Sequence, residues 1–227
     1  GLPNAYYTDP AMFSHEAARL FTTDWAAIGF GFDAPQPGCV YPVNFLGIPL
    51  VMVRDRSGQI KVFENVCRHR GMILVDEAKR LNGPITCPYH AWAYDFDGRL
   101  RATPHVGGPD IHEHGSVDCT ALSLNEVRSA VWRDVVYVNL SGDAAPFEEK
   151  AAALRQRWAE FETELHFGGA DSYFELEVAC NWKLAVENYC EAYHLPFVHP
   201  GLNSYSRLED HYNILDDASY AGQGSHV

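Results

Sequence analysis

The chain has 227 residues, a length that suits one large domain or two modest ones. Its 47% hydrophobic and 21% charged residues are typical of a globular protein and exclude a disordered chain. A net charge of −13 argues against nucleic-acid binding, which needs clustered Lys and Arg, and no apolar run approaches the ~20 residues of a membrane helix.

The N-terminal region predicts a helix and then a strand. Asp9 and Pro10 suit the cap and the first turn of a helix that runs to Phe21. Residues 25–30 are short and apolar, as in a strand, and the Pro- and Gly-rich residues 34–38 predict a turn that marks a domain boundary.

The middle of the chain carries a succession of short strand-like runs. The expected strands are 40–45, 48–54, 59–65, 92–94, 99–101, 122–127 and 130–140. Turn signals at 55–58 (Asp-Arg-Ser-Gly) and 95–98 (Asp-Phe-Asp-Gly) separate two pairs of them. Short strands with such regular turns predict an antiparallel β-sandwich, and the Gly-, Pro- and His-rich residues 104–118 predict a surface loop.

The C-terminal third changes to a helical pattern. Apolar residues at steps of three and four over 147–165 predict an amphipathic helix that packs on the core and is ended by the Gly-Gly pair that follows. Residues 174–178 alternate between apolar and acidic, as in a half-buried strand. Asn181 is expected to cap a helix over 182–194, which Pro196 stops.

Six cysteines occur, without the density of a disulfide framework. Four of them, Cys39, Cys119, Cys180 and Cys190, lie among apolar residues, where we expect buried free thiols. The N-terminus shows no basic segment followed by an apolar core, so we expect no secretory signal. Free thiols without a signal predict a reducing, cytoplasmic location.

One motif in the strand-rich region has the ligand set of an iron–sulfur centre. Cys67 and His69 form one tight pair, Cys87 and His90 form a second, and seventeen residues separate the pairs. In a Rieske [2Fe–2S] centre two thiolates hold one iron and two imidazoles hold the other, which raises the reduction potential to about −150 to +300 mV. Because each tight pair is mixed, each loop delivers one ligand to each iron, so the pattern predicts that two irons are bound.

The same residue types also occur in Cys2His2 zinc sites, so a zinc-stabilised binding module is the alternative. Zinc sites favour pairs of one residue type, with two cysteines in one pair and two histidines in the other. The mixed pairs of this chain therefore favour the cluster. A metal analysis that finds zinc and no iron would reverse this interpretation.

A second group of candidate ligands lies further along the chain. Glu187, Glu191 and His194 are spaced four and three residues apart, so on a helix they would share one face, and His199 follows. Two imidazoles with one carboxylate form the facial triad of mononuclear iron(II) oxygenases. By itself the His pair is more typical of ordinary histidines at a helix end. Downstream of the cluster motif, however, it indicates an iron site with His194 and His199 as ligands.

Several segments of the chain resemble a known family. Residues 65–71, 87–92 and 97–100 are similar to the Rieske domain of the alpha (large) subunit of Rieske non-heme iron ring-hydroxylating oxygenases. Residues 181–183, 187–188, 191–194 and 199–200 are similar to the start of the catalytic domain of the same subunit. Both sets of motifs occur in the family's order and spacing.

The resemblance implies an α+β fold, in which a Rieske-type antiparallel β-sandwich is followed by the beginning of a helix-grip (Bet v1/START-like) catalytic domain. Three segments are expected. They are an N-terminal helical segment (1–35), the Rieske [2Fe–2S] domain (36–142) and the N-terminal part of the catalytic non-heme iron domain (143–227).

The same resemblance implies the oxygenase component of a multicomponent enzyme, of the kind used in aromatic hydrocarbon catabolism. A ferredoxin and/or reductase would pass electrons, drawn indirectly from NAD(P)H, through the [2Fe–2S] cluster to a mononuclear Fe(II). This iron would activate O2 as co-substrate and hydroxylate a small aromatic or quaternary ammonium substrate, as a monooxygenase or a dioxygenase. The expected assembly is a homotrimer, with or without a beta subunit, in which the cluster of one subunit faces the iron of the next.

Glu191 has a specific role by resemblance. It stands three residues before His194, where the family has a carboxylate that bridges the two metal centres. Most members that act on aromatic rings have Asp there, and Glu resembles the branch that acts on quaternary ammonium compounds such as carnitine. For Asn188 and Tyr193 the sequence leaves two interpretations open, lining the iron site or packing nearby.

The chain departs from the family pattern in two places. Ala91 stands where Gly is common. The family's third iron ligand, a carboxylate far downstream of the second His, is expected beyond Val227, so we expect a truncated chain. Asp210, Asp216 and Asp217 lie too close in sequence and are expected to be solvated charges. The alternative function is a Rieske electron-transfer protein or an inactive fragment without oxygenase activity, which would hold two irons instead of three.

Overall fold

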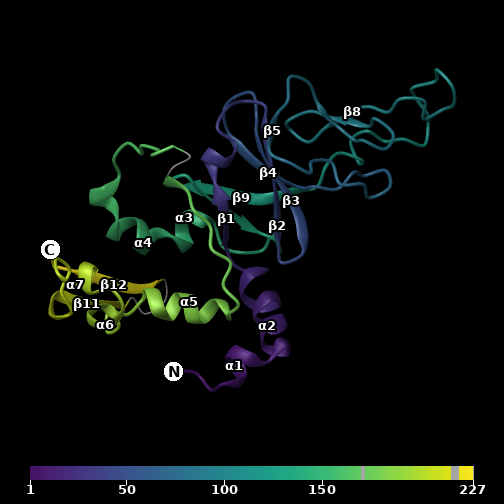
Figure 1. The fold of residues 1–227 in the computed structure, drawn as a ribbon. Helices are drawn as coiled ribbons and strands as arrows, with labels where there is room; N and C mark the ends of the chain where they lie inside the picture. The colour runs from purple at the N-terminus through teal and green to yellow at the C-terminus, as the bar shows by residue number, and fades with distance from the viewer. Residues whose placement is uncertain (170–171, 216–219, 227) are drawn as a thin grey trace. The chain divides into compact units, whose positions relative to one another are not determined.

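The structure, a computed structural model, describes residues 1–169, 172–215 and 220–226. The chain divides into two units. The strand unit is Ala17–Ala144, and the helix unit is Gly1–Glu16 together with Ala145–Val227. Figure 1 shows the strands of the first unit and the helices of the second.

The strand unit is built on a seven-stranded sheet in the order β1-β10-β9-β4-β3-β2-β5, in which each pair of neighbours is antiparallel (Figure 1). Its strands are β1 (Ala26–Phe30), β2 (Cys39–Phe45), β3 (Ile48–Arg54), β4 (Ile60–Glu64), β5 (Lys79–Arg80), β9 (Glu126–Trp132) and β10 (Val135–Asn139). A second sheet consists of β6 (Ile85–Thr86), β7 (Ala93–Tyr94) and β8 (Leu100–Ala102). The expected antiparallel β domain is confirmed.

Strand β3 lies at the centre of the core. Its side chains alternate between the two faces of the sheet, so that Leu50 and Met52 join one buried cluster while Val51 joins the other. Each such side chain stabilises the fold by about 1.5–3 kcal/mol through burial. The cluster with Val51 also contains Cys67 and Cys87. The two motif loops are therefore seated on the core itself.

Two hairpin turns have the form that the sequence predicts. Asp55 and Asp95 each accept hydrogen bonds from the backbone N–H groups two and four residues on, at 2.8–2.9 Å. Gly58 and Gly98 complete the turns with φ of 90° and 79°. Burial by itself raises the pKa of each Asp carboxyl, but the accepted hydrogen bonds outweigh it and leave the pKa below its ordinary value.

The last hairpin of the strand unit differs from the prediction. Strands were expected at 122–127 and 130–140, whereas the structure has β9 and β10 joined by Arg133 and Asp134. Both turn residues have positive φ, 52° and 65°, as a two-residue type I′ turn requires. Asn-Gly or Asp-Gly is the usual signal for such a turn, and Arg-Asp gives none, so the prediction placed the strand boundaries wrongly.

The helix unit contains short helices and one hairpin. Its helices are α1 (Ala5–Thr8), α2 (Pro10–Glu16), α3 (Phe147–Lys150), α4 (Ala152–Arg157), α5 (Trp182–Tyr189), α6 (Leu195–Val198) and α7 (Pro200–Asn203). Strands β11 (His211–Leu215) and β12 (Ala221–Ser225) pair antiparallel, and no sequence signal had indicated them. Asp9 accepts from the Ala11 N–H at 2.8 Å, as expected of a cap, but α2 ends at Glu16 and a π-helix (Ala17–Phe21) follows in the strand unit.

Two predicted elements of the helix unit are wrong. The helix expected over 147–165 breaks at Ala151 and ends by Phe161, and the strand expected over 174–178 is absent, with Phe174 82% exposed. In the described part of the chain, no strand pairs with 174–178. Both elements need a partner surface, because short helices and lone strands are marginal without packing or pairing.

The cysteine prediction is only partly correct. All six cysteines are free thiols, but of the four outside the motif only Cys39 is buried, while Cys119 and Cys180 are exposed. Among the described residues, no helix is long and apolar enough to cross a membrane.

Candidate metal centres

The two motif loops close in the same way. In each, the cysteine N–H donates to the carbonyl five residues on at 2.8 Å, and the residue four positions on donates back to the cysteine carbonyl at 3.0 Å. That residue is Gly71 after Cys67 and Ala91 after Cys87, and φ is positive at both, 72° and 56°. For Ala91 this conformation costs about 1–2 kcal/mol. The two loops therefore have the same pattern of backbone hydrogen bonds, and both hold their side chains at the core.

The two thiols of the motif lie next to each other. Cys67 is 2% exposed and Cys87 is 3% exposed. Burial raises the pKa of the Cys87 thiol, and the adjacent Cys67 thiol raises it further, whereas the backbone N–H groups of Tyr89 and His90 point at this sulfur and oppose the rise. The loop therefore carries N–H donors that favour a thiolate at Cys87.

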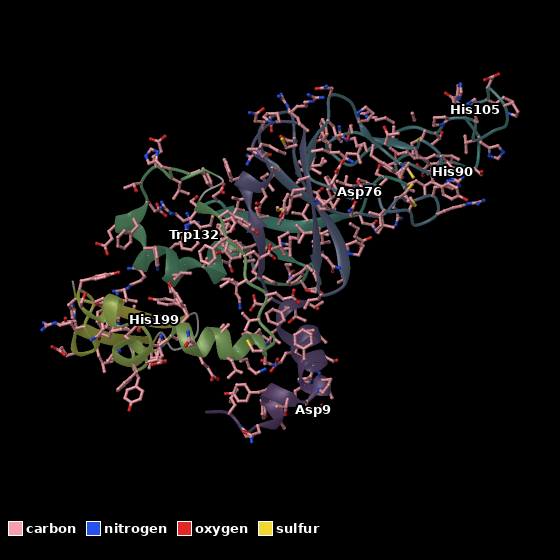
Figure 2. The ribbon with its side chains drawn as sticks, viewed as in Figure 1. Asp9, Asp76, His90, His105, Trp132 and His199 are labelled. Atoms are coloured by element: carbon pink, nitrogen blue, oxygen red, sulfur yellow. The ribbon has the colours of Figure 1, made fainter. Side chains whose placement is uncertain are left out.

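The two imidazoles of the motif also lie next to each other. The ring centroids of His69 and His90 are 4.7 Å apart, and Trp92 stacks on His69 at 4.7 Å (His90 is labelled in Figure 2). Burial lowers the pKa of His69, and the neighbouring His90 lowers it further, which favours the neutral form that can act as a ligand. The fold thus brings like residues together across the loops, sulfur beside sulfur and nitrogen beside nitrogen.

One atom of each imidazole lacks a partner. Nδ1 of His69 and Nδ1 of His90 are buried and form no hydrogen bond. A buried polar atom without a partner costs about 1–3 kcal/mol, so such atoms call for an explanation. Two adjacent Nδ1 lone pairs beside two adjacent thiols are what a two-iron group needs, because each iron would take one like pair. The residues present fit a [2Fe–2S] cluster.

Two buried polar residues support these loops, and the sequence analysis did not single them out. The Tyr94 hydroxyl lies 3.4 Å from Cys67 Sγ and accepts the Arg68 N–H at 3.1 Å. Burial raises the pKa of Tyr94, so its hydroxyl stays protonated beside the sulfur. Asn65 donates to the Val75 carbonyl at 2.6 Å and accepts the Val75 N–H at 2.9 Å, which closes the base of the first loop. The one available sequence signal for Tyr94 was its position two residues after Trp92. In a strand, this spacing places both side chains on the same face.

The second candidate site differs from its prediction. Helix α5 ends at Tyr189, where the N–H of Cys190 donates to the Val186 carbonyl at 2.9 Å. Glu191 and His194 therefore lie in the turn after the helix, and the shared helix face with Glu187 is wrong. The Glu191 carboxylate accepts from the backbone N–H groups of Tyr193 and His194, which competes with continuation of the helix.

The turn brings a carboxylate and two imidazoles together. His194 Nδ1 lies 2.5 Å from Glu191 Oε1, and this hydrogen bond is the largest cause of a lowered pKa at Glu191. The ring centroids of His194 and His199 are 5.3 Å apart, with the short helix α6 between the two residues (His199 is labelled in Figure 2). Within the described residues, no three His, Cys, Asp or Glu side chains converge on one ion position, so this group supplies two candidate ligands and a coupled carboxylate.

The other described candidates are exposed or have side-chain partners outside this group. Tyr193 is exposed, and the centroid of its ring lies 6.4 Å from the ring centroid of Phe197. Asn188 is also exposed. Asp210 pairs with Arg207 at 3.2 Å instead of standing free in solvent. Asp216 and Asp217 lie outside the described residues.

Comparison with family models gives two matches. A Rieske [2Fe–2S] domain matches residues 24–135, and the catalytic domain of the ring-hydroxylating alpha subunit matches residues 165–227. Together they cover most of the strand unit and most of the C-terminal part of the helix unit.

The chain is similar to curated proteins and solved structures of one kind. It is 33% identical over 92% of its length to the glycine betaine monooxygenase oxygenase subunit of Chromohalobacter salexigens, of which it covers 45%. It is 28% identical over 94% of its length to the carnitine monooxygenase oxygenase subunit of Escherichia coli K12, of which it covers 56%. The chain spans about half the length of these relatives.

Two solved structures extend the comparison. The quaternary ammonium Rieske monooxygenase CntA with L-carnitine superposes with a TM-score of 0.78 at 26% identity, covering 94% of this chain and 59% of that one. Naphthalene 1,2-dioxygenase with indole bound superposes with a TM-score of 0.66 at 26% identity, covering 87% and 44%.

Proposed function

This chain belongs to the family of Rieske non-heme iron ring-hydroxylating oxygenase alpha subunits, and from that premise we propose that it forms the electron-receiving part and the first half of the iron site of an oxygenase component. The observation that carries the proposal is the pairing of two buried thiols with two buried, partnerless Nδ1 atoms. A single zinc ion would need all four ligands to converge, whereas no three candidate ligands converge on one ion position among the described residues. The two imidazoles lie side by side, as do the two thiols.

The proposed roles follow from the chemistry of the side chains. Cys67 and Cys87 would hold one iron as thiolates, and His69 and His90 would hold the other through Nδ1. When bound, the cluster supplies single electrons and a mononuclear Fe(II) supplies the activation of O2. The chain contributes the dry seat of the cluster and the hydroxyl of Tyr94 beside one sulfur, which tunes the potential.

The iron site is proposed on His194 and His199. Glu191 orients His194 through the 2.5 Å contact, which fixes which ring nitrogen stays free for metal. We assign Glu191 the role of coupling this site to the cluster of a neighbouring subunit in a homotrimer. Electrons would come from a ferredoxin and/or reductase, and the free thiols fit a cytoplasmic protein.

We propose a quaternary ammonium compound as the substrate, in preference to an aromatic hydrocarbon. The glycine betaine and carnitine enzymes named above support this, because their names state such substrates. Glu191, in place of Asp, points the same way. The match of a catalytic-domain model to residues 165–227 favours an oxygenase over an electron carrier.

The test begins with the purified protein under anaerobic conditions. We expect two irons and two sulfides per chain in the cluster, and a rhombic EPR signal after reduction with dithionite. With an electron donor and added Fe(II), O2 uptake by the protein in its full reading frame should rise with glycine betaine or carnitine and not with naphthalene. A colourless protein that stays EPR-silent after reconstitution would overturn the proposal, and O2 uptake driven by naphthalene alone would overturn the substrate class.

A further inference from the structure

Helix α5 presents charged side chains at intervals of four residues. Lys183 lies in its first turn, Glu187 lies in its second turn, and Glu191 follows just past its end. Residues four apart on a helix lie one above the other, so Lys183 and Glu187 form one stripe that leads toward Glu191. Each of the three has a partner, and two of the partners come from the N-terminal segment.

The first partner is Glu16, at the end of α2. Its carboxylate accepts from Lys183 Nζ at 2.6 and 2.8 Å and from Trp182 Nε1 at 2.9 Å. Glu16 is 7% exposed and Lys183 is 8% exposed, so the pair is buried. A buried ion pair adds little net stability compared with an apolar pair of the same shape. What it provides is one fixed arrangement of the two side chains.

The second partner is Tyr7, in α1. Its hydroxyl donates to Glu187 Oε1 at 2.6 Å, one turn further along the same stripe, and Lys183 Nζ lies 5.8 Å from the centroid of its ring. The N-terminal segment therefore grips α5 at two successive turns. Contacts at two turns restrain a helix against sliding along its axis and against rotating about it.

The consequence reaches the candidate iron site through a short path. Only Cys190 separates the end of α5 from Glu191, and Glu191 holds the imidazole of His194. At the same end of the helix, Gln223 donates to the Tyr189 carbonyl at 2.8 Å. A change in the register of α5 would move the Glu191 carboxylate directly, and metal ligands tolerate displacements of only a fraction of an ångström.

We propose that Tyr7 and Glu16 are positioning residues for the iron site: by gripping α5 at Glu187 and Lys183, they set the place of Glu191 and His194. This inference rests on the proposed function, because it assumes that His194 and His199 bind metal. It assigns the N-terminal helices a part in that site, although they contain none of its ligands.

The experiment measures Co2+ binding to the purified cluster-containing protein, with the cluster kept oxidised so that Co2+ EPR can be recorded. Tyr7→Phe removes only the hydroxyl, and its matched control is Tyr6→Phe, whose hydroxyl has no partner among the described residues. Glu16→Gln removes the charge, and its control is the exposed Glu149→Gln. The exchange of Glu16→Lys with Lys183→Glu restores the pair in reverse and serves as the rescue.

Loss of an orienting contact outside the ligand shell weakens metal binding by about tenfold or more, so we expect about tenfold weaker Co2+ binding and an altered Co2+ EPR spectrum for Tyr7→Phe and Glu16→Gln. The two controls should match the wild type, and the exchanged pair should recover most of the affinity. Melting curves should show that Tyr7→Phe is folded. If Glu16→Gln is unstable, Tyr7→Phe alone decides the test.

Wild-type affinity and an unchanged spectrum in Tyr7→Phe and in folded Glu16→Gln would overturn the positioning role alone. If the wild type binds no Co2+, or if His194→Ala and His199→Ala bind it unchanged, the proposed iron site fails and this inference fails with it.

Discussion

The two candidate centres of this chain are built in opposite ways. The proposed cluster ligands lie on two loops that pack on the buried core of the strand unit and are closed by the same backbone hydrogen bonds. His194 and His199 lie on short turns of the helix unit, where His199 is exposed and Glu191 supplies one prearranged contact. A site that rests on a core is preorganised by packing, whereas a site on turns depends on a few polar contacts to hold its ligands.

The largest expected effect breaks the buried centre outright. Cys87→Ala removes one of two adjacent thiols, so one iron loses half of its protein ligands and the cluster should be lost entirely. Iron and sulfide analysis together with EPR after reduction would measure this loss. Cys39→Ala, which changes a buried thiol outside the motif, is the matched control and should keep the full cluster. A normal Rieske signal in Cys87→Ala would contradict the ligand assignment.

The next effect concerns Glu191 at the exposed centre. Glu191→Ala should leave the cluster intact and lower turnover in the full-length protein by on the order of 100-fold, as for other residues that orient a metal ligand. Steady-state O2 uptake, with cluster content measured in parallel, would test it. Glu164→Ala, at an exposed carboxylate without a described contact, should have no effect. Unchanged turnover in Glu191→Ala would discard its coupling role.

A smaller effect tests the stability of the strand unit. Asp55 accepts three hydrogen bonds in its turn, so Asp55→Ala should lower the free energy of unfolding by about 2 kcal/mol at pH 7. Because the folded pKa of Asp55 is lowered, its contribution is complete above the ordinary carboxyl pKa and disappears as the pH falls through the lowered folded value. Urea unfolding at pH 7 and pH 3 should thus show the gap between wild type and variant closing in acid. Asp143→Asn, which changes an exposed carboxylate, should show no such gap.

The smallest effect concerns the tuning of the cluster. Tyr94→Phe removes the hydroxyl beside Cys67 Sγ. In the wild type, this hydroxyl stabilises the reduced state of the cluster, which is the more negative one. One hydrogen bond of about 1 kcal/mol corresponds to a drop in reduction potential on the order of 40 mV for a one-electron couple. Redox titration followed by EPR would measure it. Tyr89→Phe lies on the other motif loop and its hydroxyl has no described partner, so its potential should stay at the wild-type value.

What could be predicted from sequence divides along the same line as the two centres. The turns at Asp55 and Asp95 and the cluster loops carry their signals locally, in Gly positions, side-chain caps and ligand spacing. The antiparallel strands follow from short apolar runs separated by turn signals, which pack on a core that is present in the chain. In this unit the prediction misplaced the strands that flank the turn of Arg133 and Asp134, whose residue types give no turn signal, and it missed the two-residue strands β5 and β6.

The helix unit was harder to predict because its apolar patterns describe elements that form only when another element packs against them. Apolar periodicity over 147–165 and alternation over 174–178 describe faces to be covered, and a face without a covering element forms neither a long helix nor a strand. The grips of Tyr7 and Glu16 on α5 join residues more than one hundred and sixty positions apart, and no local sequence pattern encodes such contacts. Glu191 and His194 were correctly brought together, but by a turn and not by a helix face.

The near-complete enclosure of Cys67 and Cys87 bears on how the protein matures. With 2% and 3% of their residue surfaces exposed, the two proposed thiol ligands are largely closed to an iron–sulfur donor while the loops keep this conformation. Delivery must therefore occur during synthesis, before the loops shut, or wait for a rare local opening whose frequency would set the pace of loading.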